Sequence, residues 1–288
     1  MSHKISRLLR KRVLREGIET LRIRFASVGV NSPIIVYQMG KVGSTTVYKS
    51  LKSAGLDCPV YHVHFLSHSG LKQAEEYFRS LEEPRLPAHI RRGKALRRRI
   101  DSNSREEWKV ITLVREPIGR EISDFFENVD RYHPQLIDRD GRVRVTQAID
   151  LLQTTLRDFD ESTNYTCTWF DRELRRVFGV DVYAHPFPQA DGFAMMSHDT
   201  CQALVLRVED LDLTLESAVP RFLGTDLPIK MVRSNVGQQK KHSVAYRHAV
   251  DNLALPLSVC EGIYSSRYAS HFYGRAMRDQ FIRKWARQ

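Results

Sequence analysis

Cysteine is scarce in this chain, with four residues among 288. The four lie far apart, at Cys58, Cys167, Cys201 and Cys260. No CxxC pair or cluster of histidine and cysteine accompanies them, so the sequence does not indicate a zinc site and we expect no bound metal. Scattered thiols of this kind fit a reducing compartment, and we therefore expect a cytoplasmic protein.

Long apolar runs are also missing. No stretch approaches the ~20 apolar residues that a membrane-spanning helix needs. The opening segment, MSHKISRLLRKRVLREG, has neither a continuous apolar region nor a small-residue cleavage site, so we expect no secretory signal. Internal repeats and low-complexity segments are absent from the sequence. With 42% hydrophobic residues, the chain can form the core of one large domain.

Positive charge is in excess, with a formal net charge of +11. The excess favours anionic partners, and much of it lies in Arg7–Arg24 and Arg85–Arg99. Residues 1–30 predict a basic amphipathic helix that either docks on the main domain or lies on an anionic membrane surface. The second run either binds an acidic glycan or forms a solvated helix face. Signatures of DNA or RNA binding are missing, so we expect no nucleic-acid partner.

The rest of the chain alternates between apolar strand patterns and helical patterns. Strands are predicted at Ile34–Tyr37, Val60–His64, Lys109–Val114, Val180–Tyr183 and Ala203–Val208. Helices are predicted at Ser44–Ala54, Leu71–Leu81, Ile90–Ile100, Pro117–Val129 and Asn164–Phe178. Strands separated by helices indicate an α/β protein with a parallel sheet and helices on both faces.

A glycine-containing loop, QMGKVGSTT, follows the first predicted strand. Gly40 and Gly43 let the backbone turn tightly and bring N–H groups against an anion. Three hydroxyl residues after Gly43 open a helix, whose N-terminus also favours negative charge. Lys41 adds a full positive charge. The loop is not a Walker A motif, because lysine precedes the second glycine; an ordinary glycine turn is the alternative interpretation.

A second candidate anion site follows the strand KVITLV. Arg115 ends this strand, and Ser123 lies about two turns into the next helix. The planar guanidinium group of arginine pairs with phosphate oxygens in a bidentate manner. Parallel sheets bind ligands at the carboxyl ends of their strands, so Arg115 and Ser123 can hold one phosphate there.

Together, the two segments resemble a known family. GKVGSTT is similar to the loop that binds the 5′-phosphosulfate in sulfotransferases that use 3′-phosphoadenosine 5′-phosphosulfate (PAPS), and VREPIGREISDF resembles their 3′-phosphate motif. More narrowly, YQMGKVGSTTVYKSLK and NYTCTWFDRELRRVFGVDVY resemble the bacterial family labelled putative capsular polysaccharide synthesis proteins. The resemblance implies a P-loop-type three-layer sandwich over residues 31–288, with C-terminal helices.

The resemblance also implies a function and residue roles. The donor would be PAPS and the acceptor a hydroxyl group of a carbohydrate or a capsular or cell-surface polysaccharide. Lys41 would meet the leaving oxygen, and Arg115 and Ser123 would hold the 3′-phosphate. The 5′-phosphosulfate would lie against Gly40, Lys41, Val42, Gly43, Ser44, Thr45 and Thr46. A basic loop with Asn235, Lys240 and Lys241 would close over the nucleotide.

Two histidines are candidates for the general base. The segment YHVH places His62 and His64 at a predicted strand end, and alternation along the strand sends both to the same face. Histidine suits proton removal at neutral pH. The segment is also similar to the YHxH of some carbohydrate 2-O-sulfotransferases, in which the second histidine is the base. This favours His64, with His62 next; structural hydrogen bonds are the alternative role for both.

Other functions stay open at this stage. A P-loop kinase or related nucleotide-dependent transferase would need a Walker lysine and a magnesium-binding acid, and neither is evident in the sequence. A non-catalytic binder of anionic polymers would explain the charge but not the paired phosphate motifs. An inactive relative is disfavoured, because Lys41, Arg115 and Ser123 are all present.

Overall fold

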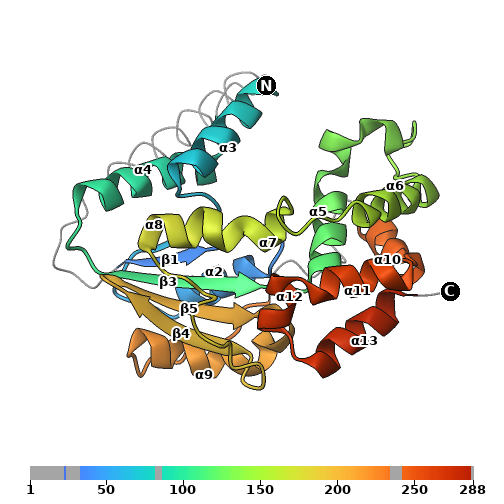
Figure 1. Ribbon diagram of the computed structural model, residues 1–288. Helices are drawn as coiled ribbons and strands as arrows, with labels where there is room; N and C mark the ends of the chain where they lie inside the picture. The colour runs from blue at the N-terminus through green and yellow to red at the C-terminus, as the bar shows by residue number, and fades with distance from the viewer. Residues whose placement is uncertain (1–22, 24–32, 82–85, 234–241, 287–288) are drawn as a thin grey trace.

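The structure is a computed structural model that describes residues 23, 33–81, 86–233 and 242–286. A five-stranded sheet forms its centre, in the order β2-β1-β3-β5-β4 (Figure 1). β1, β2, β3 and β5 are parallel, whereas β4 pairs antiparallel with β5 at one edge. The strands are β1 (Ile34–Tyr37), β2 (Val60–Val63), β3 (Trp108–Val114), β4 (Phe193–His198) and β5 (Cys201–Arg207).

The inner strands are almost continuously apolar because helices cover both of their faces. Every residue of β1 is buried, as are nearly all residues of β3 and β5. Val36 of β1 pairs with His62 on one side and Ile111 on the other. The chain segments that follow β1, β2 and β3 therefore leave the sheet at the same edge.

Helices flank the sheet. The continuous segment of α7, η2 and α8 lies over one face, and α9 lies over the other (Figure 1). The helices before β4 are α2 (Ser44–Ser53), α3 (His68–Ser80), α4 (Ala88–Ser102), α5 (Pro117–Tyr132), η1 (Pro134–Leu136), α6 (Val145–Arg157), α7 (Tyr165–Phe170), η2 (Asp171–Arg175) and α8 (Arg176–Phe178). After β5 follow η3 (Val208–Asp210), α9 (Leu211–Leu223), α10 (Ser243–Asn252), α11 (Leu257–Ser265), α12 (Arg267–Phe272) and α13 (Arg275–Trp285).

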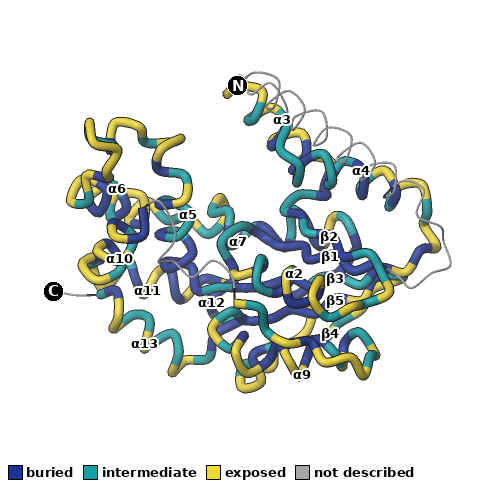
Figure 2. The backbone as a smooth tube through the Cα atoms, turned by 180° about the vertical axis from the view of Figure 1, so that it is seen from behind, coloured by how far each residue is buried: buried dark blue, intermediate teal, exposed yellow. Residues whose placement is uncertain are grey.

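The buried apolar residues form two clusters. One surrounds the sheet, whose inner strands β1, β3 and β5 are almost continuously buried (Figure 2). The other joins α5 and α6 to α10, α11 and α13, and includes Ile122, Ile263 and Trp285. Because α5 begins directly after β3, the second cluster fixes the helix that follows Arg115.

The α/β class and a sheet flanked by helices are confirmed, but one predicted strand was wrong and one strand was not predicted. β4 was missed, and its antiparallel pairing means that the sheet is not wholly parallel. Val180–Tyr183 is a turn, in which the Asp181 carboxylate accepts a hydrogen bond from the Tyr183 N–H at 2.9 Å. Val180 and Val182 are buried in the sheet cluster, which explains their strand-like alternation.

The other predicted strands and helices are confirmed, with ends that differ by a few residues. The predicted helix over Asn164–Phe178 contains a π-helical segment, η2, and ends at Gly179 with a φ of 71°. The predicted N-terminal helix over residues 1–30 lies outside the described residues, apart from Ile23, and stays a prediction. None of the helices in the described ranges is both long and apolar enough to cross a membrane.

Candidate functional site

The loop between β1 and α2 has an unusual backbone. Lys41 has a φ of 73° and Gly43 a φ of 75°, both in the left-handed region. A Cβ at Gly43 would also lie 2.7 Å from Cγ2 of Val208, so glycine is required there. Lys41 has no such freedom, and its conformation costs on the order of 1–2 kcal/mol. Strain of this size is often found where the backbone is held for a ligand.

Helix α2 begins directly after this loop, at Ser44. Its N-cap, Gly43, provides no side-chain hydrogen bond, and the first turn contains no acidic residue. The N-terminal end of α2 therefore has a positive partial charge that no side chain of the helix neutralises, which suits an anion.

A cavity of about 750 Å³ opens beside the loop. Residues from all three predicted segments line it together: Gly40, Lys41, Gly43, Ser44, Thr45, Thr46, His62, His64, Arg115 and Ser123. Val42 is the exception, because its side chain is fully buried in the sheet cluster and only its backbone can take part in binding. The predicted residues Asn235, Lys240 and Lys241 lie outside the described residues.

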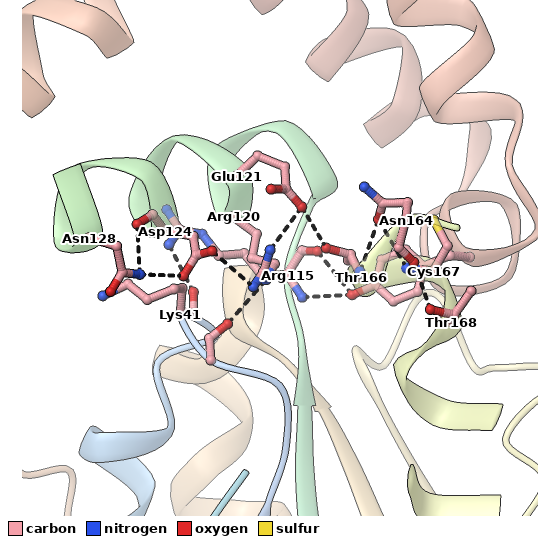
Figure 3. A network of polar contacts seen from close by, with 12 residues as sticks. Lys41, Arg115, Arg120, Glu121, Asp124, Asn128, Asn164, Thr166, Cys167 and Thr168 are labelled. Atoms are coloured by element: carbon pink, nitrogen blue, oxygen red, sulfur yellow. Dashed lines mark hydrogen bonds and ion pairs between the residues drawn. The ribbon is translucent and has the colours of Figure 1, made fainter. Parts of the chain in front are cut away.

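Arg115 joins the second motif to the glycine loop. Its Nη1 donates to the Lys41 carbonyl at 3.0 Å, and its Nη2 donates to the Tyr246 hydroxyl at 3.4 Å. Its backbone N–H donates to the Tyr268 hydroxyl at 3.2 Å, which in turn donates to the Arg115 carbonyl at 3.0 Å. The guanidinium group of Arg115 therefore uses two of its five N–H donors within the protein (Figure 3). These contacts hold the group at the wall of the cavity.

Arg120 supports the same loop, although no role was predicted for it from the sequence. Its Nε donates to the Gly40 carbonyl at 3.2 Å, and its Nη1 pairs with Glu121 at 2.8 Å. Glu121 also accepts a hydrogen bond from the Thr166 hydroxyl at 3.0 Å, which connects α5 to α7 (Figure 3). Arg120 is only 3% exposed, so it positions the loop and is not placed to bind a ligand. In the sequence, the feature that could have indicated a role for Arg120 is its place inside the motif VREPIGREISDF.

Lys41 already has an acidic partner. Its Nζ lies 2.9 Å from Glu127 on α5, and its side chain is 15% exposed. Asp124, one turn earlier, also lines the cavity, and burial raises the pKa of its carboxyl group although nearby Arg120 lowers it. A ligand phosphate at Lys41 would therefore lie close to two carboxyl groups.

The two predicted histidines differ in their hydrogen bonds. Nδ1 of His64 lies 3.1 Å from the Gln38 carbonyl, which can only accept, and 3.3 Å from the Gln38 side-chain nitrogen, which can only donate. The shorter contact, to the carbonyl, assigns the proton of the neutral ring to Nδ1. Nε2 of His64 is then the basic nitrogen. Nε2 of His62 instead lies 2.9 Å from Nε2 of Gln38 and 3.0 Å from Oγ of Ser44, so it is already an acceptor.

Burial keeps these rings neutral. Desolvation lowers the pKa of His62 to about 3, with repulsion from His64 adding to the effect. It also lowers the pKa of His64, although the hydrogen bond to Gln38 opposes the shift. A third histidine, His89 of α4, was not predicted as a site residue; its ring lies 5.6 Å from that of His64, and burial lowers its pKa to about 4.

Glu173 and Trp169 fix the backbone just beyond His64. Glu173, in the π-helical segment, accepts hydrogen bonds from the Leu66 and Ser67 N–H groups at 2.9 and 2.8 Å and from the Tyr37 hydroxyl. Trp169 donates to the His64 carbonyl at 3.3 Å. Both side chains line the cavity, and a π-helical turn such as the one that carries Glu173 is often found at functional sites.

The basic run on α4 is largely paired within the protein. Arg99 is buried against Glu106, Arg97 pairs with Asp101, and Lys94 pairs with Glu75 at 2.5 Å. Two further arginines donate to backbone carbonyls: Arg91 to Leu86 and Arg92 to His62. Arg98 is the exposed member of the run that α4 presents to solvent. These pairings favour a structural role for the run.

Residues that follow β5 and residues near the C-terminal end of α12 support the start of α5. Glu209 accepts a hydrogen bond from the Glu116 N–H at 2.8 Å and thereby holds the start of α5. Tyr273 donates to the same carboxylate at 3.1 Å. Leu206 and Tyr268 are fully buried, which is typical of residues with a structural role.

Comparison with known proteins gives one match. Residues 140–274, just under half of the chain, match the family described as "Putative capsular polysaccharide synthesis protein". This segment is similar to proteins of that family. It contains α6 to α12 but not the glycine loop, His62, His64 or Arg115. No curated protein and no solved structure matches the chain.

Proposed function

We propose that this protein is a sulfotransferase that moves a sulfuryl group from PAPS to a carbohydrate hydroxyl in polysaccharide synthesis. The observation that carries the proposal is the meeting of Gly40–Thr46, Arg115 and His64 at one cavity, although they lie on separate segments. A phosphate loop, a second phosphate site and a neutral base are the parts that such a transfer needs. The fold would then be of the P-loop type.

The two phosphate-bearing ends of PAPS would match the two candidate phosphate sites. The 5′-phosphosulfate would lie against the N-terminus of α2, and the 3′-phosphate against Arg115 and Ser123. A Cβ built on Gly40 meets no atom within 4 Å, which leaves room for an anion at the wall of the cavity. Lys41 would turn one of its N–H groups from Glu127 to the donor.

Transfer would depend on positioned charge and one proton acceptor. Nε2 of His64 would take the proton of the acceptor hydroxyl while that oxygen bonds to sulfur. As the bond between sulfur and the bridging oxygen breaks, its electron pair stays on the departing phosphate. Lys41 would stabilise this negative charge. Carbohydrate as the acceptor is supported by the family match over residues 140–274.

A second candidate is a kinase-like transferase that uses a nucleotide and magnesium. One observation favours it: Asp124 and Glu127 line the same cavity as the glycine loop, and carboxylates are magnesium ligands. Against it, these carboxylates lie next to Arg120 and Lys41, and no group of three metal-ligating side chains occurs among the described residues.

Turnover of labelled donors distinguishes the two functions. The protein is incubated with ³⁵S-labelled PAPS or γ-labelled ATP and a mixture of polysaccharides, with and without EDTA. We expect label from PAPS in the polysaccharide fraction, unchanged by EDTA and lost in Lys41→Ala. Transfer from ATP that EDTA abolishes would support the kinase and contradict sulfuryl transfer.

A further inference from the structure

Five aromatic rings form a continuous line along the cavity wall. From His64 the line passes to His89, Phe78, Tyr77 and Tyr132, with successive centroid distances of 5.6, 5.9, 5.3 and 5.7 Å. All five residues line the cavity. The line begins at the candidate base and ends at Tyr132, which is 48% exposed. We call these five residues the aromatic track.

The track crosses several elements. His64 follows β2, His89 lies near the start of α4, Phe78 and Tyr77 lie on α3, and Tyr132 is the last residue of α5. α3 and α4 extend together from one side of the sheet (Figure 1). The track therefore connects the reaction centre with the outer end of the cavity, where a long substrate would leave it.

Positive charge accompanies the outer part of the track. The guanidinium group of Arg131 lies 5.4 Å from the centre of the Phe78 ring and lines the cavity. Arg172 lines the cavity too, where it donates to Gln73 at 2.8 Å. His89 stays uncharged at neutral pH because burial lowers its pKa to about 4.

The acidic residues of the cavity have cationic or hydrogen-bonding partners of their own. Glu127 pairs with Lys41 at 2.9 Å, Asp124 lies 3.7 Å from Arg120, and Glu173 accepts backbone hydrogen bonds. Of the charged side chains that line the cavity, four are basic (Lys41, Arg115, Arg131 and Arg172) and three are acidic (Asp124, Glu127 and Glu173).

The combination suits one class of ligand. The flat apolar face of a pyranose ring packs against an aromatic ring. Successive rings of the track meet edge to face or tilted, so a sugar would pack on a single ring and not along a parallel stack. A guanidinium group recognises a carboxylate in a bidentate manner. A chain of sugars with carboxylate groups offers both features.

We propose that the aromatic track, with Arg131, is the acceptor subsite for a carboxylate-bearing glycan and guides one sugar hydroxyl to His64. The assignment rests on the proposed function for the identity of the transferred group. It differs from the earlier interpretation of Arg85–Arg99, because it places the glycan at α3 and α5 and not along α4.

Binding of uronate oligosaccharides to the full chain tests the subsite without any donor. Isothermal titration uses hyaluronan and alginate octasaccharides, together with the same octasaccharides after reduction of their carboxylates. We expect at least one acidic form to bind about tenfold more tightly than its reduced form. Arg131→Gln should weaken that binding by about 10-fold and Tyr132→Ala by about 3- to 10-fold.

Two further variants control for charge and folding. Arg98→Gln removes the same charge from the exposed α4 position and should leave binding unchanged. Arg131→Lys should restore less than half of the binding free energy that Arg131→Gln loses, because lysine keeps the charge but cannot form the bidentate pair. Equal losses for Arg98→Gln and Arg131→Gln, or equal binding of acidic and reduced forms, would overturn the proposal.

Titration with 3′-phosphoadenosine 5′-phosphate (PAP) in the same variants separates this proposal from the proposed function. PAP affinity should be unchanged in Arg131→Gln and Tyr132→Ala. If PAP binds but neither acidic octasaccharide does, the subsite is wrong and the sulfotransferase proposal stands. If glycan binding depends on Arg131 but PAP does not bind, the subsite stands and the donor assignment is wrong.

Discussion

At the scale of single residues, Gln38 connects the two histidines of the site. Its carbonyl lies 3.1 Å from Nδ1 of His64, and its side-chain nitrogen lies 2.9 Å from Nε2 of His62 and 3.3 Å from Nδ1 of His64. His62 in turn contacts Ser44 at 3.0 Å, at the first position of α2. The candidate base and the candidate phosphate loop are therefore linked through two side chains, and His62 is a positioning residue in this arrangement.

Substitution of the two histidines should have different effects. His64→Ala should lower kcat by about 10²–10⁴-fold and leave the affinity for PAP unchanged, because it removes the proton acceptor. His62→Ala should raise the KM for PAPS as well, because Ser44 and Gln38 lose their partner. Steady-state kinetics with varied PAPS measure both effects. Near-normal kcat in His64→Ala would show that another group is the base.

The pH profile provides a second check on His64. Burial lowers its pKa below the ordinary 6.5, so the base stays unprotonated into mildly acidic solution. The acid limb of kcat/KM should therefore lie below pH 6.5 and disappear in His64→Ala. An acid limb that His64→Ala leaves unchanged would assign it to a different group.

The sequence could reveal some of these residues but not others. Alternation along β2 predicted that His62 and His64 share a face, and their rings lie 5.3 Å apart. His89 and Arg120 gave no comparable signal. His89 comes from a helix that meets His64 only in the folded protein, and Arg120 contacts the Gly40 carbonyl across 80 residues of sequence.

At the scale of elements, the two glycines of the β1–α2 loop have different requirements. Gly43 has a φ of 75° and no room for a Cβ, whereas a Cβ at Gly40 would point into open space at the cavity. The first glycine is therefore available for ligand contact, and the second is needed for the fold.

Alanine at each glycine forms a matched pair of variants. Gly43→Ala should reduce the free energy of unfolding by about 2 kcal/mol, because of its left-handed φ and the contact with Val208. Gly40→Ala should change it by less than about 0.5 kcal/mol. We nevertheless expect Gly40→Ala to weaken PAP binding by about tenfold, measured by titration calorimetry. Unchanged PAP affinity in a stable Gly40→Ala protein would show that the loop is not part of the donor site.

The local sequence pattern predicted most helices and strands. It failed where contacts between residues that are distant in the sequence determine the local structure. Val180 and Val182 alternate like a strand, but the Asp181 side chain closes a turn between them. β4 has a sequence rich in methionine and alanine and is largely exposed, so its identity as a strand depends on pairing with β5. The π-helical segment depends on the position of Glu173, which bonds to residues more than 100 positions away.

At the scale of the whole molecule, the site forms because the ends of β1, β2 and β3 meet at one edge of the sheet. The helical cluster of α5, α6, α10, α11 and α13 adds Tyr246, whose hydroxyl contacts Arg115 at 3.4 Å. The meeting of these strand ends could be anticipated from a parallel sheet. The second cluster could not, because it joins helices whose residues are spread along the chain from Ile118 to Trp285.

The neutral histidines of the cavity should make stability depend on pH. Their folded-state pKa values are lowered, to about 3 for His62 and about 4 for His89, whereas an unfolded histidine has a pKa near 6.5. The unfolded chain therefore binds more protons as the pH falls below 6.5, and stability is lost in that direction.

Urea unfolding between pH 6.5 and 5 measures this loss. Each histidine should contribute up to about 1.4 kcal/mol per pH unit. His89→Gln should have a shallower pH dependence than the wild-type protein. Equal slopes in wild type and His89→Gln would contradict a buried neutral His89.

The most direct test of the central claim is a titration of the wild-type protein with PAP, ADP and ATP. A site with phosphate positions at both ends should bind PAP at least about tenfold more tightly than ADP, because Arg115 and Ser123 add charge-assisted hydrogen bonds to the 3′-phosphate. Arg115→Ala should remove this preference. Equal affinity for all three nucleotides, or a preference for PAP that survives Arg115→Ala, would contradict the account.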